Sequence, residues 1–116
     1  MALRILLVED EMTIAFMIED MLVDLGFEVV EVAMRLPEAI AAAERVDVDL
    51  AILDVNLDGH RSFPVADILA VRNIPFAFAT GYGAAGIDEA HRARPVLAKP
   101  FQLKDLQSLV ETIHGR

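Results

Sequence analysis

Short apolar runs alternate with longer amphipathic segments along the whole chain. Five runs have the length and the branched-residue content of strands: 3–8, 28–32, 50–55, 75–79 and 95–98. Five segments with helical spacing or helix-start signals separate or follow them: 12–25, 37–46, 63–71, 84–93 and 102–114. Most of the runs are continuously apolar, which is typical of parallel strands buried on both faces. This order predicts an α/β fold with a doubly wound parallel sheet.

The helical segments carry recognisable faces and boundaries. The first has one apolar face and ends at Gly26; the residues of that face are Ile14, Ile18, Met21, Leu22 and Leu25. Pro37 begins the second, and Ser62 precedes the third as its predicted cap. The last has a face predicted to be core: Leu103, Leu106, Leu109, Val110 and Ile113. The segment 84–93 is the weakest helix of the five.

Composition narrows the class of protein. The chain has 116 residues, enough for a single domain with a core, and 55% of them are hydrophobic, so it is not predicted to be disordered. It has no cysteine, which excludes a disulfide framework and a thiolate metal site. No apolar run is long enough to cross a membrane, and the N-terminus lacks the features of a signal peptide. The net charge of −9 argues against nucleic acid as a partner. A cytoplasmic protein without membrane association is expected.

Polar side chains stand where the predicted strands end. Glu9, Asp10 and Glu11 follow the first strand, and Asp54 and Asn56 stand at the end of the third. Thr80 ends the fourth, and Lys99 and Pro100 end the last. Ligands of open α/β sheets bind outside the carboxyl ends of the strands, at the point where the strand order reverses. If the first and third strands are neighbours there, Glu9, Asp10 and Asp54 converge on one pocket.

Such a cluster of carboxylates favours a divalent cation. Three carboxylates in a small pocket repel one another, and a bound cation removes that repulsion. An all-oxygen donor set indicates Mg²⁺ or a similar hard ion such as Mn²⁺. The Lys99 ammonium and the Thr80 hydroxyl suit the oxygens of a phosphoryl group. The pattern predicts that Asp54 attacks phosphorus and becomes an aspartyl phosphate.

Four motifs together resemble a known family. They are LLVEDE at 6–11, ILDVNLDG at 52–59, FATGY at 78–82 and AKPF at 98–101. In this order and spacing, the sequence is similar to the receiver domain of bacterial two-component response regulators. It resembles in particular the stand-alone, single-domain type that carries Phe-Ala-Thr-Gly on the fourth strand. The resemblance covers essentially the whole chain, and a single receiver domain at 1–116 with no output domain is expected.

The resemblance implies a fold and a set of roles. The fold is the flavodoxin-like receiver fold, with five parallel strands in the order 2-1-3-4-5 and helices on both faces. The implied roles are assigned as follows: metal binding to Glu9, Asp10, Asp54 and the backbone carbonyl of Asn56, phosphoacceptor to Asp54, switch hydroxyl to Thr80, and a phosphate-binding lysine to Lys99, whose bond to Pro100 is typically cis in the family.

Two features depart from the family pattern. Val96 stands where the family usually has an aromatic switch residue, and the one tyrosine is Tyr82, two residues after Thr80. A packing role and a gating role are both open for Tyr82. The segment between Thr80 and Lys99 is short for the family and rich in glycine, which predicts a short or mobile fourth helix.

The resemblance implies a function in signalling. A sensor histidine kinase or a phosphotransfer protein is expected to phosphorylate Asp54 in a Mg²⁺-dependent reaction, and the signal is expected to pass on by protein–protein interaction or phosphorelay. The only enzymatic activities expected are self-phosphorylation and self-dephosphorylation. The protein is expected to be a monomer or a weak, phosphorylation-dependent dimer. The alternatives are a pseudo-receiver that only binds partners and a phosphohydrolase with an Asp nucleophile, although Asn56 replaces the general acid of such enzymes.

Three further expectations concern exposed residues. The kinase is expected to dock near Met12, Phe16 and Phe101. Extra core contact is an equally consistent interpretation of Phe16 and Met17. The three histidines show no ligand spacing and are predicted to lie on the surface: His60, His91 and His114.

Overall fold

The computed structural model describes residues 2–81 and 86–114. Its centre is a parallel sheet of five strands, whose bounds are β1 Arg4–Val8, β2 Glu28–Ala33, β3 Leu50–Asp54, β6 Phe76–Thr80 and β7 Val96–Ala98. The strand order is β2-β1-β3-β6-β7, and every neighbouring pair is parallel. This confirms the predicted order 2-1-3-4-5 and makes β1 and β3 neighbours.

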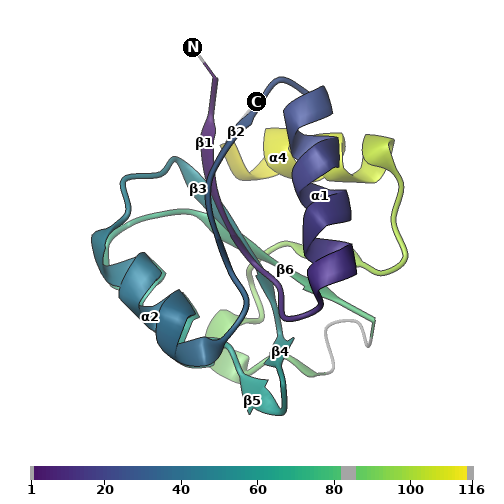
Figure 1. Cartoon of the computed structure of the whole chain (residues 1–116). Helices are drawn as coiled ribbons and strands as arrows, with labels where there is room; N and C mark the ends of the chain where they lie inside the picture. Colours follow the sequence, from purple (N-terminus) through teal and green to yellow (C-terminus); the bar gives the residue numbers. More distant parts are fainter. Residues whose placement is uncertain (1, 82–85, 115–116) are drawn as a thin grey trace.

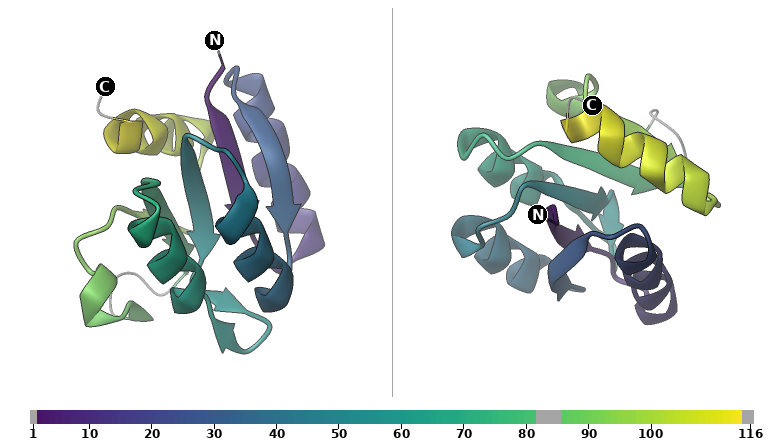
Figure 2. Two further views of the ribbon diagram at one scale, coloured as in Figure 1. Left: turned by 90° about the vertical axis from the view of Figure 1, so that its left-hand side faces the viewer. Right: turned by 90° about the horizontal axis from the view of Figure 1, so that it is seen from above.

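In the described part of the chain, four α-helices cover the two faces of the sheet (Figures 1 and 2). The helices α1, Met12–Asp24, and α4, Leu103–His114, pack on one face. The helices α2, Leu36–Arg45, and α3, Phe63–Val71, pack on the other. The predicted helices at 12–25, 37–46, 63–71 and 102–114 are confirmed to within a residue at each end. No helix in the described part of the chain is both long and apolar enough to cross a membrane.

The continuous apolar strands follow from this two-sided covering. Alternate residues of a strand point to opposite faces. In β1, Leu6 and Val8 enter the core beneath α2 and α3, whereas Ile5 and Leu7 enter the core beneath α1 and α4. All four side chains are fully buried. Both faces of the strand therefore select apolar residues, and the first polar positions come where β1 and β3 end.

A small antiparallel hairpin follows β3 and was not predicted. Its strands are β4, Asn56–Leu57, and β5, His60–Arg61. Asp58 and Gly59 form the turn, with φ of 52° and 85°. Positive φ at both central residues is what a type I′ hairpin turn requires, and Asp-Gly is among its preferred sequences.

The segment before β7 contains much less helix than predicted. The expected helix spans 84–93, of which 84 and 85 lie outside the described residues. Within 86–93, the 3₁₀-helix η2 covers only Glu89–His91, so this part of the fourth helix is short, as predicted.

His91 is buried, so its predicted surface position is wrong. Only 5% of the residue is exposed. Its ring stacks on Phe63 with the centroids 6.1 Å apart and contacts Phe76 and Phe78 edge-on. Its Nε2 lies 2.7 Å from Oδ1 of Asp67 on α3. The η2 turn directs the ring into this aromatic cluster, and the carboxylate provides the polar partner that a buried imidazole needs.

Other side-chain predictions also need correction. Leu103 is 41% exposed at the start of α4, although it was predicted to be core. Phe16 and Met17 are 50% and 45% exposed, so neither provides extra core contact. Ser62 occupies the N-cap position of α3, but its side chain makes no capping hydrogen bond. His60 and His114 are exposed, as predicted.

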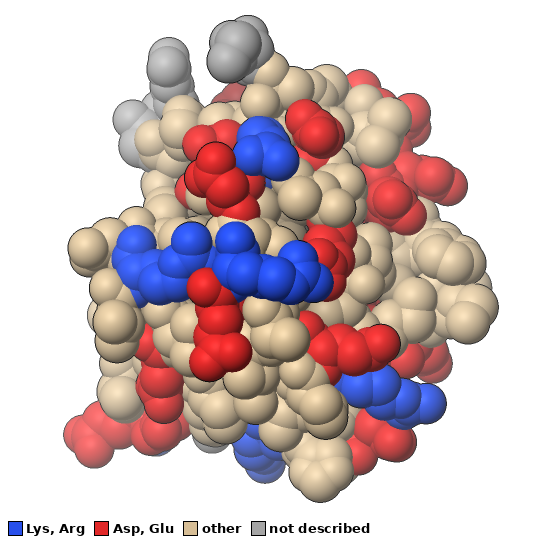
Figure 3. Space-filling model, turned by 60° about the vertical axis from the view of Figure 1, so that its left-hand side comes forward, with Lys and Arg blue, Asp and Glu red and all other residues tan. Residues whose placement is uncertain are grey.

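Basic side chains form a band across the face that carries α2 and α3, with acidic groups around it (Figure 3). Arginines tie the elements of this layer together. Nη1 of Arg72, at the end of α3, donates to the carbonyl oxygen of Ala43 in α2 at 2.7 Å. Arg45, at the end of α2, pairs with Glu31 of β2 at 3.0 Å. Both cations stand at the carboxyl end of a helix, where the helix dipole favours them.

Candidate functional site

A cleft of about 830 Å³ opens at the carboxyl ends of β1, β3, β6 and β7. Nearly all of the predicted site residues line it. They are Glu9, Asp10, Asp54, Asn56, Thr80 and Lys99. Tyr82 lies outside the described residues. The position of the cleft follows the rule for open α/β sheets, because β1 and β3 leave the sheet on opposite sides of the reversal in strand order.

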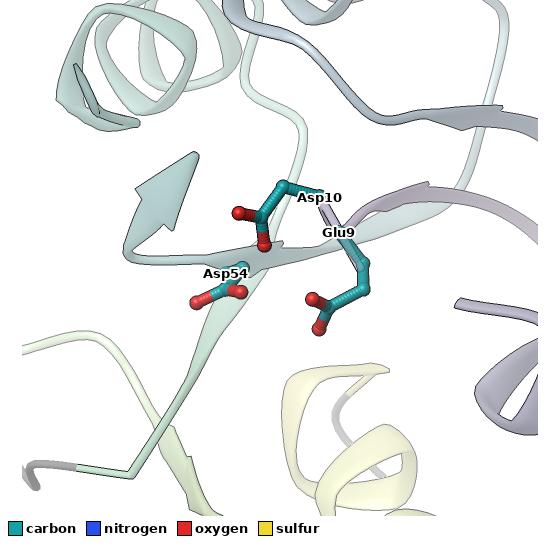
Figure 4. Close-up of side chains that lie close together, drawn as sticks. All are labelled: Glu9, Asp10 and Asp54. Atoms are coloured by element: carbon teal, nitrogen blue, oxygen red, sulfur yellow. The ribbon is translucent and has the colours of Figure 1, made fainter. Parts of the chain in front are cut away.

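Three carboxylates meet in this cleft (Figure 4). Oxygens of Glu9, Asp10 and Asp54, one from each residue, all lie within 4.8 Å of one another. The register of the sheet brings this about, because Val8 of β1 pairs with Leu53 of β3 and the acidic residues come next in each chain segment. Oδ2 of Asp10 accepts a hydrogen bond of 2.9 Å from the backbone N–H of Asp58, which ties the hairpin turn to the cluster.

Lys99 bridges two of the carboxylates. Its Nζ lies 2.7 Å from Oε1 of Glu9 and 3.3 Å from Oδ2 of Asp54. The backbone N–H of Lys99 donates to the carbonyl oxygen of Thr80 at 3.0 Å, which fixes the end of β7 against β6. The peptide bond between Lys99 and Pro100 is cis, as the family resemblance implied.

Burial and charge contacts shift the pKa values of Glu9 and Lys99. Glu9 is 1% exposed, and its burial raises its pKa to about 7, although the hydrogen bond from Lys99 acts in the opposite direction. The nearby Asp54 carboxylate raises the pKa of Glu9 further. Burial by itself would lower the pKa of Lys99, but the contacts with Glu9 and Asp54 outweigh it, and that pKa is raised. Lys99 therefore stays charged at neutral pH.

The remaining predicted residues surround Asp54. The backbone N–H of Asn56 donates to Oδ1 of Asp54 at 3.3 Å, and this holds the carboxylate at the start of the hairpin. Thr80 is the last residue of β6 and is 3% exposed. The Asp54 side chain itself is 13% exposed, so an incoming group can reach it from the cleft. The individual roles predicted for these residues remain predictions.

Arg61 also lines the cleft, although no motif or spacing in the sequence indicated it. The β4–β5 hairpin brings it there, because it pairs Arg61 with Asn56. The Asp-Gly turn was the available signal for this hairpin, but strands of two residues give no periodicity to support it.

The donors of the cleft fit a hard divalent cation. All three clustered side chains offer carboxylate oxygens, the ligand type that Mg²⁺ selects. Lys99 offsets part of their negative charge but contacts only two of the three. Asp10 adds a third negative charge that no described cation pairs with, and this favours a bound metal ion.

A sheet of this order with such a cleft defines a receiver domain. The profile of the response regulator receiver domain family matches residues 5–111, and the chain belongs to this family. Receiver domains act in two-component signalling and bind Mg²⁺ in the active-site cleft.

Individual relatives agree with this assignment. The transcriptional regulatory protein PdtaR of Mycobacterium tuberculosis is 32% identical over 117 residues, which cover 97% of this chain and 57% of PdtaR. The chain thus spans about half the length of the curated relatives it matches. The solution structure of SdrG from Sphingomonas melonis Fr1 is similar with a TM-score of 0.86 and 43% identity, over 97% of this chain and 96% of SdrG.

A third relative is the receiver domain of the sensor histidine kinase PA1611 from Pseudomonas aeruginosa PAO1. Its structure is similar with a TM-score of 0.82 and 26% identity over the full length of both chains. That crystal structure has a magnesium ion coordinated in the active-site cleft.

Proposed function

We propose that this domain accepts a phosphoryl group on Asp54 from a phosphohistidine of a sensor kinase or a phosphotransfer protein. The observation that carries the proposal is the meeting of Asp54 with two further carboxylates and with Lys99 at the end of the sheet. A nucleophilic carboxylate, a cation for the phosphoryl oxygens and ligands for a metal ion are the groups that phosphoryl transfer to aspartate needs.

The transfer exchanges one bond for another at phosphorus. An oxygen of Asp54 forms a bond to phosphorus while the bond between phosphorus and the donor imidazole breaks, and the electron pair of that bond stays on the imidazole nitrogen. The hydrogen bond from the Asn56 N–H to Oδ1 orients the carboxylate and leaves Oδ2, which faces Lys99, on the side of the ammonium. Lys99 and Thr80 are the groups placed to stabilise the negative charge of the phosphoryl oxygens.

Glu9, Asp10, Asp54 and the carbonyl of Asn56 are the residues that would hold Mg²⁺ or Mn²⁺. When bound, the ion would neutralise negative charge on the carboxylates and on the phosphoryl oxygens. Glu9 has to lose its proton for the cluster to reach full charge, so proton release accompanies metal binding.

The domain is proposed to signal through proteins and not through nucleic acid. The net charge of −9 repels a phosphate backbone. Met12 and Phe16 on α1 are 59% and 50% exposed, and Phe101 in the loop after β7 is half-buried, so these apolar side chains are available to a kinase. Phe16→Ala should slow phosphotransfer from the cognate kinase but not from acetyl phosphate. Val23→Ala, at an exposed position farther along α1, is the matched control.

Intact-protein mass spectrometry after incubation with acetyl phosphate tests the proposal. The expected result is a gain of one phosphoryl mass in the presence of Mg²⁺. The gain should be absent after chelation and in Asp54→Asn. A lack of gain from both acetyl phosphate and a phosphorylated kinase would refute the proposal and favour a pseudo-receiver.

A further inference from the structure

Arg61 brings a second cation to the cleft from the β4–β5 hairpin. The pairing of β4 with β5 sets Arg61 opposite Asn56, which is two residues beyond Asp54. The side chain of Arg61 lines the same cleft as Asp54 and Lys99. It is not among the residues on which the proposed transfer depends, and its position calls for a separate explanation.

The bonding of Arg61 differs from that of Arg35, the arginine that contacts the turn of the same hairpin. Its Nη1 donates a hydrogen bond of 3.2 Å to the carbonyl oxygen of Gly86. Within residues 2–81 and 86–114, no carboxylate lies within ion-pair distance of it, although the cleft holds three. By contrast, Arg35 pairs with Asp58 at 3.0 Å on the turn of the same hairpin. A guanidinium has five N–H donors, so a single bond to a carbonyl leaves most of its donor capacity for a ligand.

The two cations of the cleft are therefore available to different groups. Lys99 is held by Glu9 and by Asp54, the attacking carboxylate. Among the described residues, Arg61 is held by a neutral carbonyl alone, and exchanging that carbonyl for an anion strengthens its hydrogen bond. The planar fork of a guanidinium also matches the oxygens of a phosphoryl group, which an ammonium contacts only as a point charge.

We propose that Arg61 binds the phosphoryl oxygens of the donor as it enters the cleft, and that it releases the Gly86 carbonyl in doing so. This inference rests on the proposed function of Asp54 as phosphoacceptor. Arg61 thereby determines how tightly an anionic donor is held, and Lys99 acts on the transfer itself. Arg61 therefore favours phosphodonors whose phosphoryl group is highly charged.

The test is the rate of phosphorylation as a function of acetyl phosphate concentration, in saturating Mg²⁺. Arg61→Gln is the decisive variant, because its amide can still donate to Gly86 but carries no charge. It should raise the concentration for half-maximal rate about 10-fold, the usual effect of losing a charge-assisted hydrogen bond. The maximal rate should change less than about 2-fold, because an interaction made equally with bound donor and transition state affects binding alone.

Three controls separate this role from a structural one. Arg61→Lys should recover part of the loss, because it keeps the charge without the fork. Arg35→Ala, which removes the cation that pairs with Asp58 on the hairpin turn, should leave the dependence of the rate on acetyl phosphate concentration unchanged. With phosphoramidate, which carries less negative charge than acetyl phosphate at neutral pH, the effect of Arg61→Gln should be smaller.

The proposal is overturned if Arg61→Gln leaves the half-saturating concentration unchanged, or if Arg35→Ala raises it equally. A lower maximal rate with unchanged half-saturation also overturns it, since that would show a structural tie between the hairpin and Gly86. Failure of the wild-type protein to accept phosphate from both acetyl phosphate and a phosphorylated kinase would instead refute the proposed function, and this inference with it. The wild-type curve thus distinguishes the two failures.

Discussion

Replacing Glu9 by Gln should stabilise the metal-free protein at about pH 8, although it removes a residue of the site. The pKa of Glu9 is about 7 in the folded chain and 4.5 in a free side chain. A folded pKa above the unfolded one means that folding favours the protonated carboxyl group. The stabilisation is therefore complete below about pH 4.5 and is lost as the pH rises through about 7. Above that pH, ionised Glu9 costs the folded state about 3 kcal/mol, because burial raises its pKa from 4.5 to about 7.

Glutamine is uncharged at every pH and therefore mimics the protonated carboxyl group of Glu9. Its oxygen can still accept from Lys99, but its amide nitrogen replaces Oε2, which accepts a hydrogen bond of 3.2 Å from the N–H of Glu11. The loss of that bond subtracts about 1 kcal/mol. We expect Glu9→Gln to increase the free energy of unfolding by about 2 kcal/mol at about pH 8. Below about pH 4.5 only the lost bond to Glu11 remains, and the variant should be about 1 kcal/mol less stable than the wild type.

Urea unfolding followed by circular dichroism, in chelator and at several pH values, measures this difference. Glu111→Gln, at an exposed position on α4, is the matched control and should change little. Mg²⁺ at about 100 times its dissociation constant should return about 2.7 kcal/mol to the wild type and less to the variant. The reasoning is refuted if Glu9→Gln is less stable than the wild type at about pH 8, or if the difference does not depend on pH.

Three other perturbations follow from the same contacts. Lowering the pH from about 8 to about 6 should weaken apparent Mg²⁺ binding about 10-fold in calorimetric titrations, because Glu9, with a pKa of about 7, has to lose a proton before the ion binds. Glu9→Gln should abolish this dependence of Mg²⁺ affinity on pH. His91→Ala should lower the free energy of unfolding, measured in urea, by about 2–4 kcal/mol, because it leaves a cavity in a buried aromatic cluster. Asp67→Asn, which weakens the polar contact of His91, should lower it by about 1 kcal/mol. An equal loss in His60→Ala, at an exposed position, would contradict the structural role of His91. Ser62→Ala should leave stability unchanged or raise it by about 1 kcal/mol, because among the described residues the Ser62 Oγ is buried without a hydrogen-bond partner, and a loss above about 1 kcal/mol would show a cap that the structure lacks.

The sheet could be predicted from sequence because both of its faces are covered. Residues 5–8 of β1 and 50–53 of β3 are all apolar and buried, so the change to Glu9 and Asp54 marks the strand ends clearly. The gathering of these carboxylates, however, depends on β1 and β3 being neighbours. Hydrophobic patterning contains no information on strand order, and the resemblance to the receiver family provided it.

The hairpin and the aromatic cluster could not be predicted in the same way. Two-residue strands have no measurable period, so only the Asp58-Gly59 turn signalled the hairpin that carries Arg61. The burial of His91 depends on a single 3₁₀ turn and on Asp67 of another helix. The contact with Asp67 joins residues 24 positions apart, and it leaves no pattern in the local sequence.

Reductive trapping tests the central claim most directly. Borohydride converts an aspartyl phosphate to homoserine, and peptide mass spectrometry locates that residue in the sequence. After phosphorylation with acetyl phosphate and Mg²⁺, we expect homoserine at position 54, and an unchanged chain when the metal is chelated. Homoserine at position 10 or 58, or none in a protein that had gained a phosphoryl group, would contradict it.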